Sequence, residues 1–341
     1  MLTLTKCDLC GSVHFTTLFK QTDFVYYTTE EYFTYMRCEN CGLVFLNPRP
    51  EIGQMERYYP DAYSFYRVGK WGNIKEHLKN SIYVVYYANL QNGLINLLLR
   101  LILFPMWLLF KCYGVTENIR QYRKYPFLEK HQGKRVLDVG CGSGTSFHPF
   151  ENRYSMVWLN QRGYQCEGVE IDGRACEVAA KNGMRVYQGL FDAVELEAEA
   201  YDVVRMNYSL EHVDFPSDYF RQAYRVLKKG GELIVSVPNY DGITYKVFPE
   251  AVEAPRHLFY FNQKTLTSYF TKNGFEVRSV STDPTPEVFK YVVEHYPGWK
   301  QYEPGNGGKR IKIKNFDLLP FYRVASSRGL GDDITIVGVK K

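Results

Sequence analysis

The carboxyl-terminal two thirds of the chain alternate short apolar runs with segments of helical periodicity. The runs that predict strands are VLDVG, CEGVEI, RVYQG, YDVVRMN, GGELIVSVPN, FEVRSV and DDITIVGVKK, which start at residues 136, 166, 185, 201, 230, 275 and 332. Helical segments are expected at 143–162, 173–182, 218–227 and 264–273. This alternation predicts an α/β fold with a doubly wound sheet, which binds ligands at the carboxyl ends of its strands.

A different pattern precedes this region, because the residues from Leu94 to Phe110 are almost all apolar. This stretch is at the short limit for crossing a bilayer, and Arg100 near its middle costs about 2.5–3.5 kcal/mol on insertion scales. Asn96 and Pro105 disfavour a spanning helix further. A helix packed on the protein as core or lid and a helix lying in a membrane interface both stay open. Nearby basic residues suit an anionic lipid surface, although a solvated flank has the same composition: Lys75, Lys79, Lys111, Arg120, Arg123 and Lys124.

Composition places the chain among globular proteins, with 45% hydrophobic and 23% charged residues in 341 positions. The net charge of +5 permits anionic partners. No long basic patch with interleaved aromatic residues is present, so nucleic acid is not expected as a partner. The first residues lack the apolar core of a signal peptide. We therefore expect a cytoplasmic protein, with peripheral contact at the inner face of the membrane if residues 94–110 lie in the interface.

Four of the eight cysteines form two C-x-x-C-G motifs, CDLCG and CENCG. Two thiolates at this spacing can face one tetrahedral ion, and four sulfurs close its coordination shell. We predict structural Zn²⁺ bound by Cys7, Cys10, Cys38 and Cys41. The expected organisation is a zinc ribbon at 1–50, an aromatic and helical linker with the lid or membrane-interface helix at 51–125, and an α/β domain at 126–341 with an insertion at 283–333.

The stretch VLDVGCGSGT carries glycines at every second position from Gly140 to Gly144 directly after a buried strand. A glycine-rich turn between a strand and a helix brings backbone close to a ligand. The dinucleotide-binding pattern G-x-G-x-x-G requires its third glycine at Thr145, so the spacing does not match that fingerprint. Asp138, two residues before the first glycine, is also foreign to it.

These residues strongly resemble motif I of the class I S-adenosylmethionine-dependent methyltransferases, whose sheet is Rossmann-like and seven-stranded. GVEID resembles their second acidic motif, and the run from YDVV through SLEHV to RVLKKGGELIVSVPN resembles the later motifs. The resemblance covers about residues 126–282. The ribbon followed by NPRP is similar, more weakly, to methyltransferases associated with polysaccharide and glycan biosynthesis.

The resemblance implies a cofactor site that the residue chemistry also fits. Asp138 would accept from the cofactor's ammonium, Glu170 would accept from both ribose hydroxyls, and Ile171 would cover the adenine. The implied cofactor-binding residues are Asp138, Gly140, Gly142, Gly144, Glu170 and Ile171. Asp172 is expected to cap the next helix.

Two histidines are candidates for removing the proton of the methyl acceptor. His212 in SLEHV follows the fourth strand, where the family's acceptor approaches, and Glu211 beside it would orient the ring or face away. His257 in APRHLFYF is the second candidate, next to Arg256, which suits a phosphate or a carboxylate. For each of these residues a purely structural role, packing or clamping its loop, stays open.

The sequence therefore predicts a methyltransferase that uses S-adenosylmethionine. The expected acceptor is a small polar molecule, most simply a hydroxyl of a sugar, glycan or glycolipid precursor. The alternatives are an RNA methyltransferase, since zinc ribbons also bind nucleic acid, and a protein that binds the cofactor without catalysis.

Overall fold

The computed structural model describes residues 1–60, 93–112, 133–144, 155–160, 163–283, 285–295, 321 and 324–341. Its contacts divide the chain into two units, Met1–Tyr63 with Phe191–Lys341, and Ser64–Leu190. The first fifty residues thus share a unit with the carboxyl-terminal part of the chain. The domain boundaries drawn from the sequence at 50 and 125 stay a prediction. Most of the predicted helix at 143–162 and most of the insertion at 283–333 lie outside the described residues.

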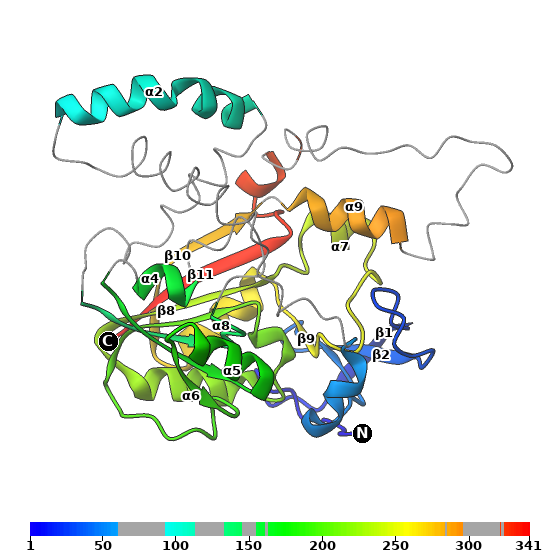
Figure 1. The fold of residues 1–341 in the computed structure, drawn as a ribbon. Coiled ribbons are helices and arrows are strands. Elements are labelled where there is room, and N and C mark those ends of the chain that lie inside the picture. Colours follow the sequence, from blue (N-terminus) through cyan, green and yellow to red (C-terminus); the bar gives the residue numbers. More distant parts are fainter. Residues whose placement is uncertain are drawn as a thin grey trace, which may run out of the picture. The chain divides into compact units, whose positions relative to one another are not determined.

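The unit Ser64–Leu190 contains three parallel strands (Figure 1). They lie in the order β4 (Arg135–Val139), β5 (Gln165–Glu170) and β6 (Arg185–Gln188). The register pairs Val139 with Val169 and Glu170 with Gln188. Parallel strands in this register end at one edge of the sheet, so the turn after β4 and the acidic end of β5 are neighbours. The helices of this unit are α2 (Gly93–Cys112), α4 (Met156–Asn160) and α5 (Gly173–Lys181).

The other unit contains a small antiparallel sheet and four strands of the main sheet. The small sheet has the order β1 (Phe15–Gln21), β2 (Phe33–Cys38), β3 (Val44–Leu46) and β9 (Phe259–Tyr260). The main-sheet strands have the order β10 (Phe275–Asp283), β11 (Asp333–Lys340), β8 (Leu227–Pro238) and β7 (Tyr201–Asn207). The helices are η1 (Ile52–Tyr58), η6 (Leu210–His212), α6 (Pro216–Val226), α7 (Ile243–Val247), α8 (Gln263–Lys272) and α9 (Pro286–His295).

These four strands and β4 to β6 are the seven strands of one mixed sheet, which confirms the predicted Rossmann-like fold class. The contacts β10–β11 and β11–β8 are antiparallel, and β4–β5, β5–β6 and β7–β8 are parallel. Strand β8 begins at Leu227, before the predicted start at Gly230, because the helix ahead of it already ends at Val226. The residues of β8 from Glu232 to Val237 are all buried, as expected for a central strand covered on both faces.

Helix α6 shows why the amphipathic pattern in the sequence located the helices correctly. Its buried positions Phe220 and Ala223 follow helical spacing and face the core. The Phe220 ring stacks on Tyr269 of α8 at 5.4 Å between centroids and meets Phe270 edge-on at 5.0 Å. The two helices therefore share one aromatic contact surface.

Helix α2 confirms the predicted helix over the apolar stretch, and Pro105 lies within it. None of the side chains described between residues 97 and 109 is buried. Eight large apolar side chains of this helix are exposed: Leu97, Leu98, Leu99, Leu101, Ile102, Phe104, Leu108 and Leu109. The interpretation of this stretch as buried core therefore has no support in the described residues.

Among the residues that the structure describes, no helix has the length and apolar character required to span a membrane.

Candidate active site and metal centre

The glycine-rich turn after β4 is stabilised by its own backbone. Gly140, Gly142 and Gly144 have φ of 73°, 54° and 72°, a left-handed conformation that side chains disfavour. The Gly140 N–H donates to the Val169 carbonyl at 2.8 Å, and the Gly144 N–H donates to the Cys141 carbonyl at 3.0 Å. All three glycines are thus required by conformation, as the motif predicted.

The Glu170 carboxylate connects this turn to the end of β5. One oxygen accepts from the Gly142 N–H at 2.8 Å, and the other accepts from the N–H groups of Ile171 at 2.8 Å and Asp172 at 3.0 Å. Burial raises the pKa of Glu170, and these hydrogen bonds oppose that rise. The Gly142 amide, expected to approach the ligand, is here bonded to Glu170. The two carboxylate oxygens have four lone-pair sites together, and these bonds use three of them, so one site remains for a ribose hydroxyl in this arrangement.

The neighbours of Glu170 also have properties that suit a cofactor site. The Ile171 side chain is 51% exposed, which leaves an apolar surface that an adenine ring can cover. Asp138 is buried at the end of β4. Asp172 caps α5, as predicted, because its side chain accepts from the N–H groups of Arg174 and Ala175.

Gly168 is a residue of this site that the sequence reading missed. A Cβ atom at this position of β5 would lie 2.4 Å from the Cys141 sulfur, which real contacts do not allow. Glycine here lets the turn lie directly on the strand. A glycine inside a strand marks such a close approach, so the signal was present in CEGVEI.

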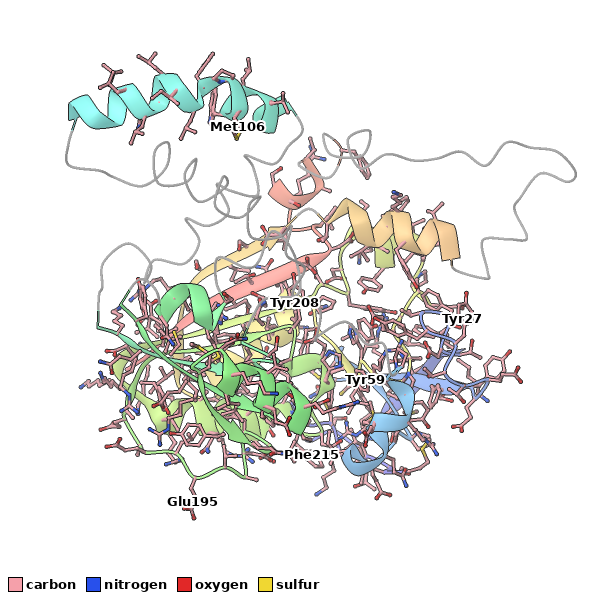
Figure 2. All side chains as sticks on the ribbon, in the orientation of Figure 1. Tyr27, Tyr59, Met106, Glu195, Tyr208 and Phe215 are labelled. Atoms are coloured by element: carbon pink, nitrogen blue, oxygen red, sulfur yellow. The ribbon has the colours of Figure 1, made fainter. Side chains whose placement is uncertain are left out.

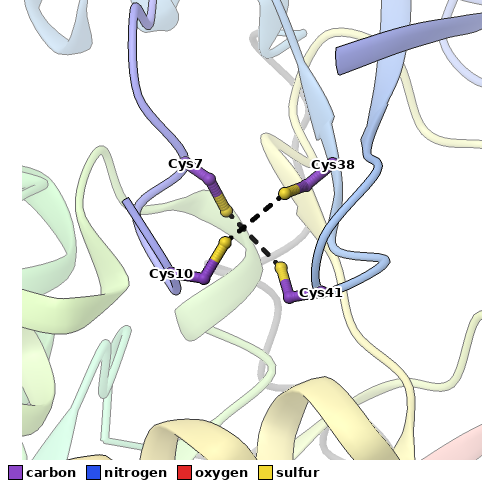
Figure 3. A group of neighbouring side chains, drawn as sticks. All are labelled: Cys7, Cys10, Cys38 and Cys41. Carbon is purple, nitrogen blue, oxygen red and sulfur yellow. Dashed lines mark hydrogen bonds between the residues drawn. The ribbon is translucent and has the colours of Figure 1, made fainter. Parts of the chain in front are cut away.

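The four cysteines of the C-x-x-C-G motifs meet, as predicted (Figure 3). The sulfurs of Cys7 and Cys41 are 3.6 Å apart, and those of Cys10 and Cys38 are 3.5 Å apart. A tetrahedral zinc with bonds of about 2.3 Å to sulfur places its ligands about 3.8 Å from one another. The sulfurs are too far apart for disulfides, and all four cysteines are free. A hydrogen bond from Cys7 lowers the pKa of the Cys41 thiol to about 5.

The two cysteine motifs fold in the same way, which explains their shared glycine. The Gly11 N–H donates to the Cys7 carbonyl at 2.8 Å, and the Gly42 N–H donates to the Cys38 carbonyl at 2.9 Å. Both glycines have positive φ, 73° and 84°. Each turn thereby directs its two thiols to the same side.

The structure also brings together all three predicted catalytic residues, Glu211, His212 and His257. The rings of His212 and His257 are 4.7 Å apart between centroids, in an edge-to-face arrangement. His212 Nε2 lies 4.0 Å from a carboxylate oxygen of Glu211. Their ligand atoms all lie within 4.8 Å of one another, so this group too could hold a metal ion.

The hydrogen bonds fix the tautomer of His212. Its Nδ1 lies 3.0 Å from the Arg256 carbonyl, which can only accept, so Nδ1 carries the proton. The Nε2 of the neutral ring then has a free lone pair on the side of Glu211. The Tyr59 hydroxyl lies 3.5 Å from the same Nδ1, and no pattern in the sequence predicts this contact.

Burial controls the charge of this group. Burial lowers the pKa of both His212 and His257 to about 3. The neighbouring His257 lowers the pKa of His212 further, and Arg256 does the same for His257. Both rings are therefore neutral near pH 7. Burial also raises the pKa of Glu211 well above its usual range. Both carboxyl oxygens of Glu211 and Nδ1 of His257 are buried and lack a hydrogen-bond partner within the described part of the chain. Such groups are costly to leave unpaired.

Arg256, considered for binding a phosphate or a carboxylate, is engaged within the protein. Its guanidinium donates to the Asp23 carboxylate at 3.0 and 2.9 Å and to the Tyr58 carbonyl at 3.0 Å. The side chains of Arg256 and Asp23 are fully buried. The structure therefore supports the clamping role for Arg256.

Residues 115–280 match the family described as methyltransferase domain. Among the curated relatives, the ubiquinone biosynthesis O-methyltransferase of Pseudomonas savastanoi pv. phaseolicola is 33% identical over 120 residues, which are 33% of this chain and 48% of the relative. An uncharacterised protein of Methanocaldococcus jannaschii is 27% identical over 124 residues, 36% of this chain and 54% of that protein. The chain thus spans about half the length of these relatives.

Two solved structures are similar to this chain at lower identity. A S-adenosylmethionine-dependent methyltransferase of Thermotoga maritima is 23% identical with a TM-score of 0.42, covering 69% of this chain and 100% of its own. Phosphoethanolamine N-methyltransferase 2 of Haemonchus contortus is 19% identical with a TM-score of 0.44, covering 66% and 52%. With the seven-stranded sheet and the glycine-rich turn, the family match shows that the chain carries a class I S-adenosylmethionine-dependent methyltransferase domain.

Proposed function

We propose that the protein transfers the methyl group of S-adenosylmethionine to an oxygen of a sugar, glycan or glycolipid precursor. The observation that supports the transfer is the arrangement of Glu170 against the turn at Gly142. It places a partly buried carboxylate, with one acceptor site left, beside glycine backbone that a ligand can approach closely. The exposed Ile171 supplies an apolar cover next to it. When bound, the cofactor supplies a methyl group on a positively charged sulfur that is already a good leaving group.

The oxygen acceptor and the sugar class rest on separate support. Curated relatives that match this domain are named O-methyltransferases of ubiquinone biosynthesis. The four cysteines followed by NPRP support a glycan or glycolipid acceptor through the weaker resemblance. The three residues Glu211, His212 and His257 are the groups available for the proton of a hydroxyl.

The proton of that hydroxyl would pass to Nε2 of His212, whose lone pair is free in the tautomer set by the Arg256 carbonyl. Methylation and proton removal together convert the neutral hydroxyl into an ether, and the positive charge of the sulfonium ends on the imidazole. A carboxyl oxygen of Glu211, 4.0 Å away and without another partner among the described residues, would accept a hydrogen bond from the new Nε2–H. We therefore propose His212 as the base and Glu211 as its positioning partner.

We further propose that the four cysteines bind one structural Zn²⁺. The sulfur separations fit a tetrahedral ion, and four thiolates leave no open position for substrate. The ion would fix the turn that carries Asp8, which accepts from the backbone and hydroxyl of Ser217 at 3.0 and 2.7 Å. The zinc would therefore stabilise the contact between the Cys7–Cys10 turn and α6.

The decisive experiment supplies the purified protein with S-adenosylmethionine labelled on its methyl group and with separated cell fractions. Label in a glycan or glycolipid fraction that survives base hydrolysis, as an ether does, supports the proposal. Label in RNA would establish the RNA methyltransferase instead. If the protein binds the cofactor but no fraction takes up label, the protein binds S-adenosylmethionine without catalysing methyl transfer.

A further inference from the structure

Helix α2 is an anomaly that methyl transfer does not explain. Its apolar side chains include Ile102 at 72% and Leu101 at 65% exposure. Single exposed apolar residues are ordinary, but a contiguous exposed run on one helix marks an interaction surface. Figure 2 shows side chains projecting from several sides of this helix, with Met106 among them.

The distribution of polar positions around α2 identifies the kind of surface that covers it. At 3.6 residues per turn, positions 96, 100, 107 and 111 fall on one narrow face. They hold Asn96, Arg100, Trp107 and Lys111, and every other position from 94 to 110 is apolar or proline. A helix bound in a protein groove has a wide polar face toward water. A helix that lies in the plane of a bilayer surface buries its apolar face at the boundary of headgroups and acyl chains, and its polar residues lie at the headgroups.

The residues of that narrow face suit the headgroup level. Arginine and lysine can bury their methylene chains and extend their charges to the interface. Tryptophan is enriched at that depth because its ring is apolar and its N–H is polar. Arg100 near the middle of the stretch, which disfavours a spanning helix, is therefore compatible with a helix that lies flat.

Charge complementarity selects an anionic lipid surface over a second copy of this chain. Between residues 64 and 130 the sequence has ten lysines or arginines and three glutamates, and α2 itself has no acidic residue. This excess of seven positive charges exceeds the net charge of +5 of the whole chain. Two copies would bring these like charges together, whereas an anionic leaflet attracts them.

We propose that α2 is a monotopic anchor that lies in the interface of an anionic membrane. The anchor would hold the methyltransferase at a membrane surface, where a lipid-linked acceptor is concentrated. Membrane binding by α2 does not depend on the proposed reaction. Only the benefit of holding the enzyme near a lipid-linked acceptor rests on the proposed function.

The test is co-sedimentation of the 341-residue chain with large unilamellar vesicles. One set contains phosphatidylcholine with a third phosphatidylglycerol, and the other contains phosphatidylcholine alone. We expect the bound fraction to be at least tenfold higher on the anionic vesicles and to fall when salt screens the charges. The double variant Leu101→Glu/Leu108→Glu should lose this binding.

A matched variant separates the anchor from a general effect of added charge. Val13→Glu/Tyr32→Glu places the same two charges at exposed apolar positions outside α2, at 56% and 72% exposure, and should bind vesicles like the wild type. Affinity for S-adenosylhomocysteine should be equal in all three proteins, which shows that each is folded and keeps membrane binding separate from the proposed reaction.

Three outcomes would overturn the anchor. The wild type could fail to sediment with anionic vesicles, or both double variants could lose binding equally. The wild type could also be a dimer in solution that Leu101→Glu/Leu108→Glu converts to a monomer without any change in vesicle binding, which would assign α2 to contact between copies.

Discussion

The guanidinium of Arg256 and the carboxylate of Asp23 form a two-pronged ion pair between positions 233 residues apart, with both side chains fully buried. The ring of Tyr26 lies against the guanidinium at 4.4 Å. The pair ties the amino-terminal strands to the loop that carries His257. The contact therefore makes the position of a candidate catalytic loop depend on the first fifty residues.

Removing one partner of this pair should destabilise the unit strongly. Asp23→Asn leaves a buried guanidinium without its counter-charge, which costs about 3–5 kcal/mol. Chemical denaturation followed by circular dichroism should show this loss, and Asp23→Asn/Arg256→Met should recover part of it. Lys246→Met, which breaks the partly exposed pair with Asp241, is the control and should change stability by less than about 1 kcal/mol. Equal effects of Asp23→Asn and Lys246→Met would contradict the buried pair.

The same pair predicts a sign for the pH dependence of stability. Burial of Asp23 opposes its ionisation, but hydrogen bonds from Arg256 and Thr28 outweigh burial and lower its pKa to about 2. A depressed carboxyl pKa contributes stability above the unfolded value near 3.8, and this contribution is lost as pH falls toward 2. The stability difference between wild type and Asp23→Asn should therefore shrink as pH falls from 5 toward 2, which denaturation at several pH values can measure.

Cofactor affinity should depend on Glu170. Glu170→Ala removes the expected acceptor for the ribose hydroxyls and the bond that holds the Gly142 amide, so binding of S-adenosylhomocysteine should weaken by about 1–3 kcal/mol. Titration calorimetry measures this change, with Glu177→Ala, an exposed carboxylate on α5, as the control. Unchanged affinity in Glu170→Ala would remove Glu170 from the cofactor site.

The cysteine cluster should contain one zinc per chain, and its loss should spread beyond the first fifty residues. From sequence, Cys38→Ser is expected to unfold a separate ribbon and leave the rest folded. The structure changes that expectation, because β3 pairs with β9 and Lys272 of α8 donates to the Leu9 carbonyl at 2.8 Å. We expect Cys38→Ser to destabilise the whole unit that these contacts join.

Metal analysis tests this prediction together with hydrogen exchange of α8. If the hydrogen-exchange protection of α8 is unchanged in Cys38→Ser, the zinc ribbon folds independently of the rest of the unit. A native protein that is folded without metal would contradict the zinc site. Two equivalents of metal would assign the second to Glu211, His212 and His257.

The sequence located most elements of this fold because their periodicity is local. The strand at 201–207 and the cap at Asp172 follow from neighbouring residues alone, and the structure has both where they were expected. The four cysteines and the triple Glu211, His212 and His257 were also identified by residue type, and the structure brings each group together.

Contacts between distant segments could not be predicted in this way. Arg49, fully buried between the rings of Phe215 and Phe259 at 5.3 and 5.1 Å, gave no sequence signal, because a buried arginine is recognisable only once its partners are known. Strands β3 and β9 pair although more than two hundred residues separate them in the sequence. Periodicity reports which face of an element is apolar and not which element covers it.

The role of His212 can be separated from a structural one by the pH dependence of turnover. Because the pKa of His212 is lowered to about 3, the ring stays unprotonated well below neutral pH. Wild-type kcat/KM should therefore not fall between pH 7 and 5 through protonation of this base. His212→Ala should lower turnover by about 10²–10⁴, the usual effect of removing a general base, while leaving the affinity for S-adenosylhomocysteine unchanged.

The residual activity of His212→Ala should rise with pH, as an already ionised acceptor replaces the missing base. Steady-state rates with labelled cofactor across pH 5 to 9 measure both trends, and His257→Ala serves as the comparison because its ring lies 4.7 Å from that of His212. Lost cofactor affinity in His212→Ala would make the residue structural. Normal turnover would transfer the role to His257 or leave alignment of the acceptor alone to carry the reaction.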